Sequence, residues 1–162
     1  MKKNNVKIYC MKNEKYTPVI LATLKCNRKC IFCLRSDDSD PPHSITDIKN
    51  ILNRYKDTIT IEGGEPTLSK RLEYIIKLAK SSGAREVILM TNAYLLDNYL
   101  KIKRIINNGV DIFSINFPSH IEKLFNILTQ TKGQYKKNSF SYKKNIKDIT
   151  RKVKNNMCNK LN

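Results

Sequence analysis

Hydrophobic and polar positions between residues 17 and 117 follow two alternating patterns. Short apolar or alternating runs predict strands at 19–24, 58–62, 86–90 and 111–117. Between them, apolar residues recur three or four positions apart and predict helices at 44–55, 69–82 and 95–108. Strands that alternate with such helices favour parallel β-α units with right-handed crossovers. The sequence therefore predicts an α/β fold, a partial (β/α) barrel of about four parallel units, rather than a sandwich.

Single residues mark where these helices begin and end. Ser44 followed three positions later by Asp47 is a start signal, and Gly83 and Gly109 follow the second and third helices as stop signals. The third helix is expected to bury one stripe of side chains, formed by Leu95, Tyr99, Ile102 and Ile106. The segment 19–24 is apolar throughout, which is typical of a strand buried on both faces.

Three cysteines follow the first predicted strand, at Cys26, Cys30 and Cys33. A short loop brings their sulfurs to one metal centre with little loss of chain entropy. Three ligands on a four-iron cluster leave one iron open to a small molecule, which is a catalytic arrangement. The alternative is a zinc site completed by Cys10 or His43. Zinc sites usually carry paired ligand knuckles, and this sequence shows no such pairing.

A second motif, Gly63-Gly64-Glu65-Pro66, directly follows the second predicted strand. The glycines permit positive φ and close approach of the backbone to a ligand. Glu65 offers an acceptor for a cationic amino group, and Pro66 stops the strand. An ordinary turn from strand to helix is the alternative interpretation of these four residues.

Together the two motifs resemble the signature of the radical S-adenosylmethionine (radical SAM) superfamily, including the aromatic Phe32 before the last cysteine. The resemblance implies a 4Fe-4S cluster on Cys26, Cys30 and Cys33, whose unique iron chelates S-adenosylmethionine. It implies reductive cleavage to a 5'-deoxyadenosyl radical that takes hydrogen from a substrate the sequence does not identify. It also implies an external electron donor of the flavodoxin or ferredoxin type, and a Gly-Gly-Glu-Pro segment that holds the methionine amino group.

Polar residues at the ends of the later strands are further candidates. Asn92 follows the third predicted strand, and Ser114 and Asn116 lie two apart near the end of the fourth, so they share one face. In α/β folds the chemistry lies at the carboxyl ends of the strands. The resemblance implies contacts of these side chains with the ribose and carboxylate of S-adenosylmethionine, and simple strand-end polar residues are the alternative.

The net charge of +17 is concentrated toward the carboxyl terminus. Residues 132–162 contain ten Lys or Arg and one acidic residue, Asp148. The sequence predicts a partial core domain at 1–135 and a basic, lysine-rich helix or tail at 136–162, where Ile146, Ile149 and Val153 keep helical spacing. Nucleic acid is a possible partner of this tail. Compositional drift is favoured, because no aromatic-interleaved or arginine-rich pattern is present.

Length creates the last expectation. A six-unit barrel typically needs more chain than 162 residues, so the resemblance covers the amino-terminal part of such a core. The alternative function is a truncated or non-catalytic iron-sulfur module, or a subunit that needs a partner chain or self-association at the open barrel edge. The sequence shows no signal peptide or membrane span, and the isolated Cys10 and Cys158 do not resemble a disulfide framework. A cytoplasmic protein is therefore expected.

Overall fold

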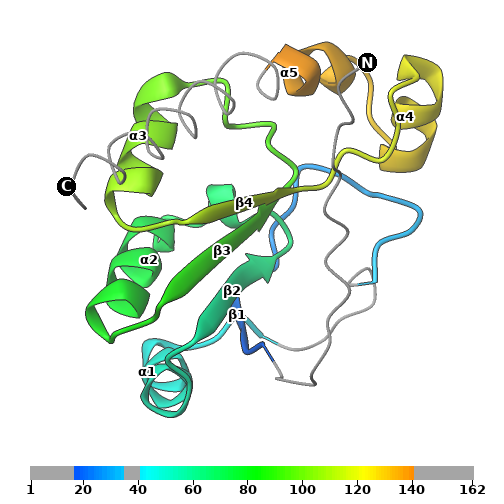
Figure 1. The fold of residues 1–162 in the computed structure, drawn as a ribbon. Helices are drawn as coiled ribbons and strands as arrows, with labels where there is room; N and C mark the ends of the chain where they lie inside the picture. The colour runs from blue at the N-terminus through cyan, green and yellow to red at the C-terminus, as the bar shows by residue number, and fades with distance from the viewer. Residues whose placement is uncertain (1–16, 35–40, 141–162) are drawn as a thin grey trace, which may run out of the picture.

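The computed structural model describes residues 17–34 and 41–140, and Figure 1 shows how their helices and strands are arranged. Four parallel strands form one sheet in sequence order: β1 (Val19–Thr23), β2 (Thr58–Gly63), β3 (Glu86–Thr91) and β4 (Ile112–Ile115). They are connected by α1 (Ile45–Arg54), α2 (Leu72–Ser81) and α3 (Tyr99–Asn107). This arrangement confirms the predicted α/β fold of four parallel units, since parallel neighbours require a crossover connection. Among residues 17–34 and 41–140, no helix is both long enough and apolar enough to span a bilayer.

The hydrophobic core lies between these three helices and one face of the sheet. Alternate residues of the strands point to that face and are buried: Ile20, Ala22, Ile59, Ile61, Val87 and Leu89. The helices cover them with a second set of fully or almost fully buried side chains: Ile48, Leu52, Ile75, Ile76, Ile102 and Ile105. Each large side chain contributes about 1.5–3 kcal/mol by leaving water. Burial of one face fixes the strand register, and thereby the place where each strand ends.

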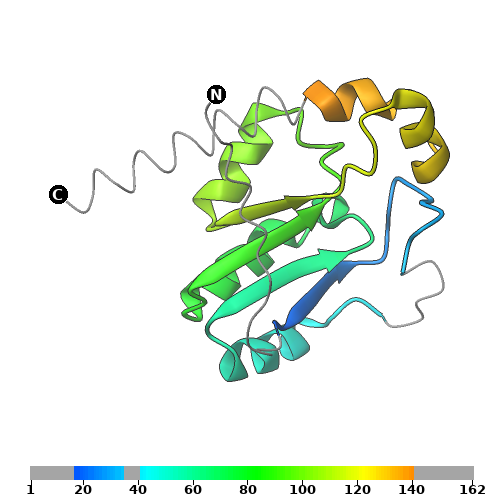
Figure 2. The ribbon, with the colours of Figure 1, turned by 45° about the vertical axis from the view of Figure 1, so that its right-hand side comes forward.

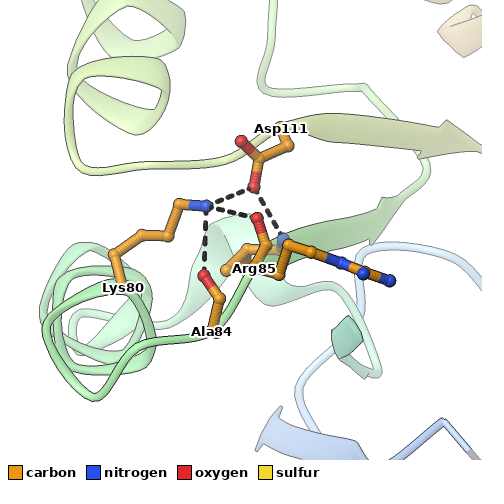
Figure 3. Close-up of polar contacts among 5 residues, drawn as sticks. Lys80, Ala84, Arg85 and Asp111 are labelled. Atoms are coloured by element: carbon orange, nitrogen blue, oxygen red, sulfur yellow. Dashed lines mark hydrogen bonds and ion pairs between the residues drawn. The ribbon is translucent and has the colours of Figure 1, made fainter. Parts of the chain in front are cut away.

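The amino-terminal end of the sheet is held by an ion pair. Lys80 Nζ lies 2.8 Å from Asp111 Oδ2 and donates to the carbonyl oxygens of Ala84 and Arg85 at 3.3 and 3.0 Å (Figure 3). The same carboxylate oxygen accepts the Val87 N–H at 2.7 Å. These contacts join the turn between α2 and β3 to the start of β4. They lie at the end of the sheet opposite to the carboxyl ends of the strands.

Helix boundaries follow the sequence signals at most ends. Ser44 caps α1 in a capping box with Asp47, as predicted, and Gly83 and Gly109 end their helices with φ of 91° and 114°. The hydrophobic pattern predicts that the third helix begins at residue 95, whereas α3 begins at Tyr99. Asn98 caps this helix, because its side chain accepts the N–H of residue 101.

The predicted buried stripe of the third helix is wrong at Tyr99, which is 47% exposed. Because α3 begins at Tyr99, the residues before it form a turn in which Ala93 adopts a φ of 58°. That turn brings Leu96 into the core, where it is fully buried, in place of Tyr99. Ile102 is buried as predicted, and Ile106 packs against the core while partly exposed.

Three elements were not predicted: the short 3-10 helix η1 (Pro66–Leu68), α4 (Glu122–Thr129) and α5 (Gln134–Phe140). Figure 2 shows α4 and α5 beyond the carboxyl ends of the strands, on the side toward which the loop after β1 extends. The predicted domain division at 135/136 falls inside α5. The expected tail helix around Ile146, Ile149 and Val153 lies outside the described residues, so the division stays a prediction.

Candidate functional site

All predicted site residues except Glu65 line one cavity of about 640 Å³ at the carboxyl ends of the strands. They are Cys26, Cys30, Cys33, Phe32, Gly63, Gly64, Asn92, Ser114 and Asn116. The first four belong to residues 24–34, which we name the cysteine loop. The others come from the ends of β2, β3 and β4. Four consecutive β-α units thus contribute to one concave surface, at the end of the sheet where α/β proteins bind ligands.

The cysteine loop is held against the turn that follows β2. Gly64 N–H donates to Thr23 O and Glu65 N–H donates to Lys25 O, both at 2.8 Å. A β-carbon on Gly64 would lie 2.5 Å from Lys25 O, and one on Gly63 would lie 2.2 Å from Thr23 O. Gly63 has the predicted positive φ, at +136°. In this structure Gly63 permits close approach to the end of β1 at Thr23, and Gly64 permits close approach to the backbone of the cysteine loop.

Glu65 is buried, with 1% of its surface exposed. Its Oε1 accepts the N–H and hydroxyl of Thr67 at 3.0 and 2.5 Å and the Thr91 hydroxyl at 2.7 Å. Its Oε2 accepts the Asn92 N–H at 2.7 Å. The carboxylate therefore caps η1 and ties the end of β2 to the end of β3. A contact with the amino group of a cofactor stays a prediction.

The side chain of Asn92 is fixed from two sides at the end of β3. Tyr94 N–H donates to Asn92 Oδ1 at 3.0 Å, so the amide nitrogen of Asn92 points the other way and donates to Asn27 Oδ1 at 2.8 Å. Asn27 Nδ2 is left as a buried donor without an acceptor among the described residues. Such a group costs about 1–3 kcal/mol. Its place beside Cys26 suits a cluster sulfur, which accepts hydrogen bonds.

Arg28 is a site residue that the sequence analysis did not select. It lies in the middle of the cysteine loop, lines the cavity, and is only 7% exposed. Nε donates to Gln134 Oε1 at 3.1 Å, and the two terminal nitrogens donate to the carbonyl oxygens of Asn92 and Asn116 at 3.1 and 3.4 Å. Its guanidinium carbon lies 5.0 Å from the centre of the Phe125 ring. Burial lowers the pKa of Arg28, against the attraction of nearby acidic groups.

Two backbone amides of the cysteine loop reach the end of α4. Lys29 N–H donates to Thr129 O at 3.3 Å and Ile31 N–H donates to Leu128 O at 3.0 Å. Carbonyls in the last turn of a helix have no partner within the helix. The loop satisfies two of them, and Gln130 ends α4 in the left-handed region with a φ of 53°. The carboxyl end of α4 is therefore a further support of the loop.

Cys26, Cys30 and Cys33 form no disulfide bonds. Burial raises the pKa of Cys26 and of Cys30, so both favour the neutral thiol before a metal binds. Metal ligands are thiolates, and loading the site therefore releases protons. In the part of the chain that the structure describes, no three Cys, His, Asp or Glu side chains are grouped for a metal ion. Ligation requires the three thiols to turn toward one another within the cavity.

His43 lies beside the outer edge of β1, where it is hydrogen-bonded to Leu21. The ring nitrogen Nδ1 of His43 accepts the backbone N–H of Leu21, and the backbone N–H of His43 donates to Leu21 O, both at 3.0 Å. The lone pair of Nδ1 is thus already used, which disfavours the zinc alternative through this atom. Cys10, the other candidate for a fourth zinc ligand, lies outside the described residues.

Comparison with known families gives an independent assignment. The model of the radical SAM superfamily matches residues 20–159, most of the chain. The chain belongs to the radical SAM superfamily. This confirms the resemblance carried by the cysteine motif and the Gly-Gly-Glu-Pro segment. Radical SAM proteins use a 4Fe-4S cluster and S-adenosylmethionine, and they generally need a reductant.

Radical SAM relatives of this chain carry several different names. A probable GTP 3',8-cyclase of Methanocella arvoryzae is 32% identical over 124 residues, covering 73% of this chain and 39% of the relative. A putative glycyl-radical enzyme activating enzyme of Methanocaldococcus jannaschii is 33% identical over 108 residues, covering 64% and 42%. A 7,8-dihydro-6-hydroxymethylpterin dimethyltransferase of the same organism is 28% identical over 123 residues, covering 68% and 24%. The chain thus spans about two fifths of the length of the first two.

Proposed function

We propose that this chain binds a 4Fe-4S cluster through Cys26, Cys30 and Cys33 and S-adenosylmethionine in the adjoining cavity, for hydrogen abstraction from a substrate. The observation that carries the proposal is that the three cysteines share one cavity with Gly63 and Gly64, in a chain of the radical SAM superfamily. The chemistry that the bound group supplies is reductive cleavage of S-adenosylmethionine to methionine and a 5'-deoxyadenosyl radical.

The remaining residues of the cavity hold and orient these groups. Next to Cys26, Asn27 has a buried amide donor without an acceptor among the described residues, which a cluster sulfur would satisfy. Phe32, 42% exposed, forms an apolar part of the wall, and Ser114 and Asn116 offer polar contacts from β4 to ribose or carboxylate oxygens. Glu65 does not line the cavity. Its internal hydrogen bonds fix the positions of Thr91 and Asn92, which do.

Anaerobic reconstitution tests the ligand assignment. The full chain should take up one 4Fe-4S cluster, seen as iron and sulfide content together with charge-transfer absorption. Alanine in place of Cys26, Cys30 or Cys33 should each abolish the cluster, whereas the matched replacements of Cys10 and Cys158 should leave it. Stoichiometric zinc in protein purified without oxygen, with no charge-transfer absorption after reconstitution, would contradict the proposal.

Binding of S-adenosylmethionine is tested on the reduced cluster. Adding the cofactor should alter the electron paramagnetic resonance spectrum, because its amino and carboxylate groups then coordinate the open iron. Asn116→Ala, which removes a side chain from the cavity wall just after β4, should weaken this response without lowering the iron content. An unaltered spectrum at millimolar cofactor would count against a site in this cavity.

The outer edge of β4 is a place where a further strand can join the sheet. Among the described residues, β4 pairs only with β3, so its other edge has unpaired backbone groups. We infer that a further strand, from a partner chain or a second copy, pairs there before the site turns over. Two measurements on the reconstituted protein test this: light scattering gives the oligomeric state, and formation of 5'-deoxyadenosine gives the number of turnovers. Multiple turnovers by a species shown to be monomeric would refute it. An electron donor of the flavodoxin or ferredoxin type and a cytoplasmic location stay predictions.

A further inference from the structure

We infer that Arg28 is the positioning residue of the cysteine loop: its guanidinium locks the loop to α5 and to the ends of β3 and β4, and its buried charge stabilises the reduced cluster. The inference rests on the proposed function, because it assumes that the loop carries the 4Fe-4S cluster. It extends that function to a residue between the ligands and to a helix that the cysteine motif does not include.

The guanidinium of Arg28 bridges three separate elements at once. Its donors reach the carbonyl oxygen of Asn92 after β3, the carbonyl oxygen of Asn116 after β4, and the side chain of Gln134 in α5. A planar group with several donors in fixed directions can make these contacts together, whereas the single ammonium of lysine cannot. This side chain therefore links loop, sheet and helix, in addition to the backbone hydrogen bonds of the loop.

Helix α5 completes the attachment from the other side. Gln134 uses both ends of its amide, since Oε1 accepts from Arg28 while Nε2 donates to Asn27 O at 3.1 Å. Asn138, one turn later and only 1% exposed, donates from Nδ2 to the same Asn92 carbonyl that Arg28 uses. Two side chains of α5 thus contact the cysteine loop and the end of β3 directly.

Three aromatic rings support the guanidinium. Phe125 lies under Arg28 and contacts Phe117 and Tyr135 with ring centres 5.3 and 5.5 Å apart. Tyr135 also donates from its hydroxyl to His120 O at 2.5 Å, which fixes the first turn of α5. The rings come from α4, α5 and the segment after β4, so they hold the guanidinium in place away from water.

The charge of Arg28 is the second part of the inference. Its three hydrogen-bond acceptors are neutral: two backbone carbonyls and one amide oxygen. A buried cation with neutral acceptors is costly unless a negative group lies near it. Electrostatic attraction acts on the guanidinium from Cys30, from the buried carboxylate of Glu65 and from Cys26, in the case of the two cysteines only when they are thiolates. A cluster on these sulfurs is negative and becomes more negative on reduction, so Arg28 favours the reduced state.

The test compares Arg28→Gln, Arg28→Lys and Gln134→Ala with the parent protein. Arg85→Gln is the matched control, because this arginine lies at the opposite end of the sheet with 76% of its side chain exposed. Three quantities are measured: the rate of iron loss to a chelator, the midpoint potential of the cluster, and amide hydrogen exchange in the cluster-free protein. The last needs no cluster and reports directly on the Lys29 and Ile31 amides that bond to α4.

Arg28→Gln should lose iron about 10–100 times faster, the order of effect expected for a residue that supports a metal site from outside the ligands, and should shift the midpoint potential to more negative values. Arg28→Lys should lose iron faster but keep a potential near that of the parent. Gln134→Ala should speed exchange of the loop amides with little change in potential. Arg85→Gln should match the parent in all three measurements.

The outcomes separate this inference from the proposed function. If the parent binds no cluster, the proposed function fails, and exchange in the cluster-free variants still decides whether Arg28 positions the loop. If Arg28→Gln does not fold, Arg28→Lys and Gln134→Ala carry the test. Iron loss, potential and loop exchange in Arg28→Gln equal to those of Arg85→Gln would overturn the inference.

Discussion

Alanine at Gly64 tests whether the glycine turn holds the cysteine loop in place. The new β-carbon would lie 2.5 Å from the carbonyl oxygens of Leu24 and Lys25. Non-bonded atoms settle near 3.5 Å, so the loop has to move by about 1 Å. That movement strains the two 2.8 Å hydrogen bonds that Gly64 and Glu65 donate to Thr23 O and Lys25 O, each worth about 0.5–1.5 kcal/mol. With about 1–3 kcal/mol for overpacking, we expect Gly64→Ala to lose up to about 2–6 kcal/mol of stability.

Two other glycines separate crowding from backbone strain. Gly83 has a φ of +91° and its β-carbon would meet only Lys56 Cδ at 4.0 Å, so Gly83→Ala should lose only about 1 kcal/mol from strain. Gly63 has both problems, a φ of +136° and a contact of 2.2 Å with Thr23 O, and should lose most. Urea unfolding of the cluster-free variants measures the three losses, and chelator assays measure iron retention. The reasoning is refuted if Gly64→Ala is no less stable than Gly83→Ala and holds iron equally well.

Three further changes test the supports of the fold and the site. Asp111→Ala should lower the free energy of unfolding by about 1–2 kcal/mol, because the Val87 N–H loses its acceptor; urea titration measures this. Glu65→Gln should cost about 1–3 kcal/mol, because an amide cannot accept all four internal donors. The unfolding midpoint checks this against Glu73→Gln, a control whose partly exposed carboxylate pairs with Arg104. Ser44→Ala should cost about 1 kcal/mol by loss of the α1 cap. Hydrogen bonds from Ser44 depress the pKa of Asp47, so their stabilisation is present above its unfolded pKa and lost as pH falls through the folded value. Acid unfolding below about pH 4 should therefore depend less on pH in Ser44→Ala.

Most of the fold follows from the sequence because its signals are local. The apolar run at Val19–Thr23 and the alternating strand before Gly63 show their burial within a few residues. The capping box at Ser44 and the stop at Gly109 are likewise short-range chemistry. Tyr99 was misplaced because the cap at Asn98 and the turn at Ala93 decide where α3 begins, and the hydrophobic period runs through both without a break.

The supports of the site were not accessible from the sequence for a different reason. Arg28 stands between other basic residues in a chain with 31 Lys and Arg, so nothing in its surroundings marks it as buried. Its partners Asn116 and Gln134 lie 88 and 106 positions away. The motif selected Glu65 as a cofactor contact, which stays a prediction, and the sequence does not show that its carboxylate accepts the hydroxyl of Thr91.

The attachments of the cysteine loop imply that cluster binding and folding are linked. The loop is bonded to the turn after β2 through Glu65 N–H, to the ends of β3 and β4 through Arg28, and to α4 through Lys29 and Ile31. These contacts belong to successive β-α units, so the ligands are arranged only when all four units are folded. By linkage, a cluster that binds only this arrangement stabilises every element that creates it. Elements with few core contacts gain most, because local opening limits their stability. We therefore conclude that α4 and α5, which pack beyond the main core, depend on the cluster more than α1 does.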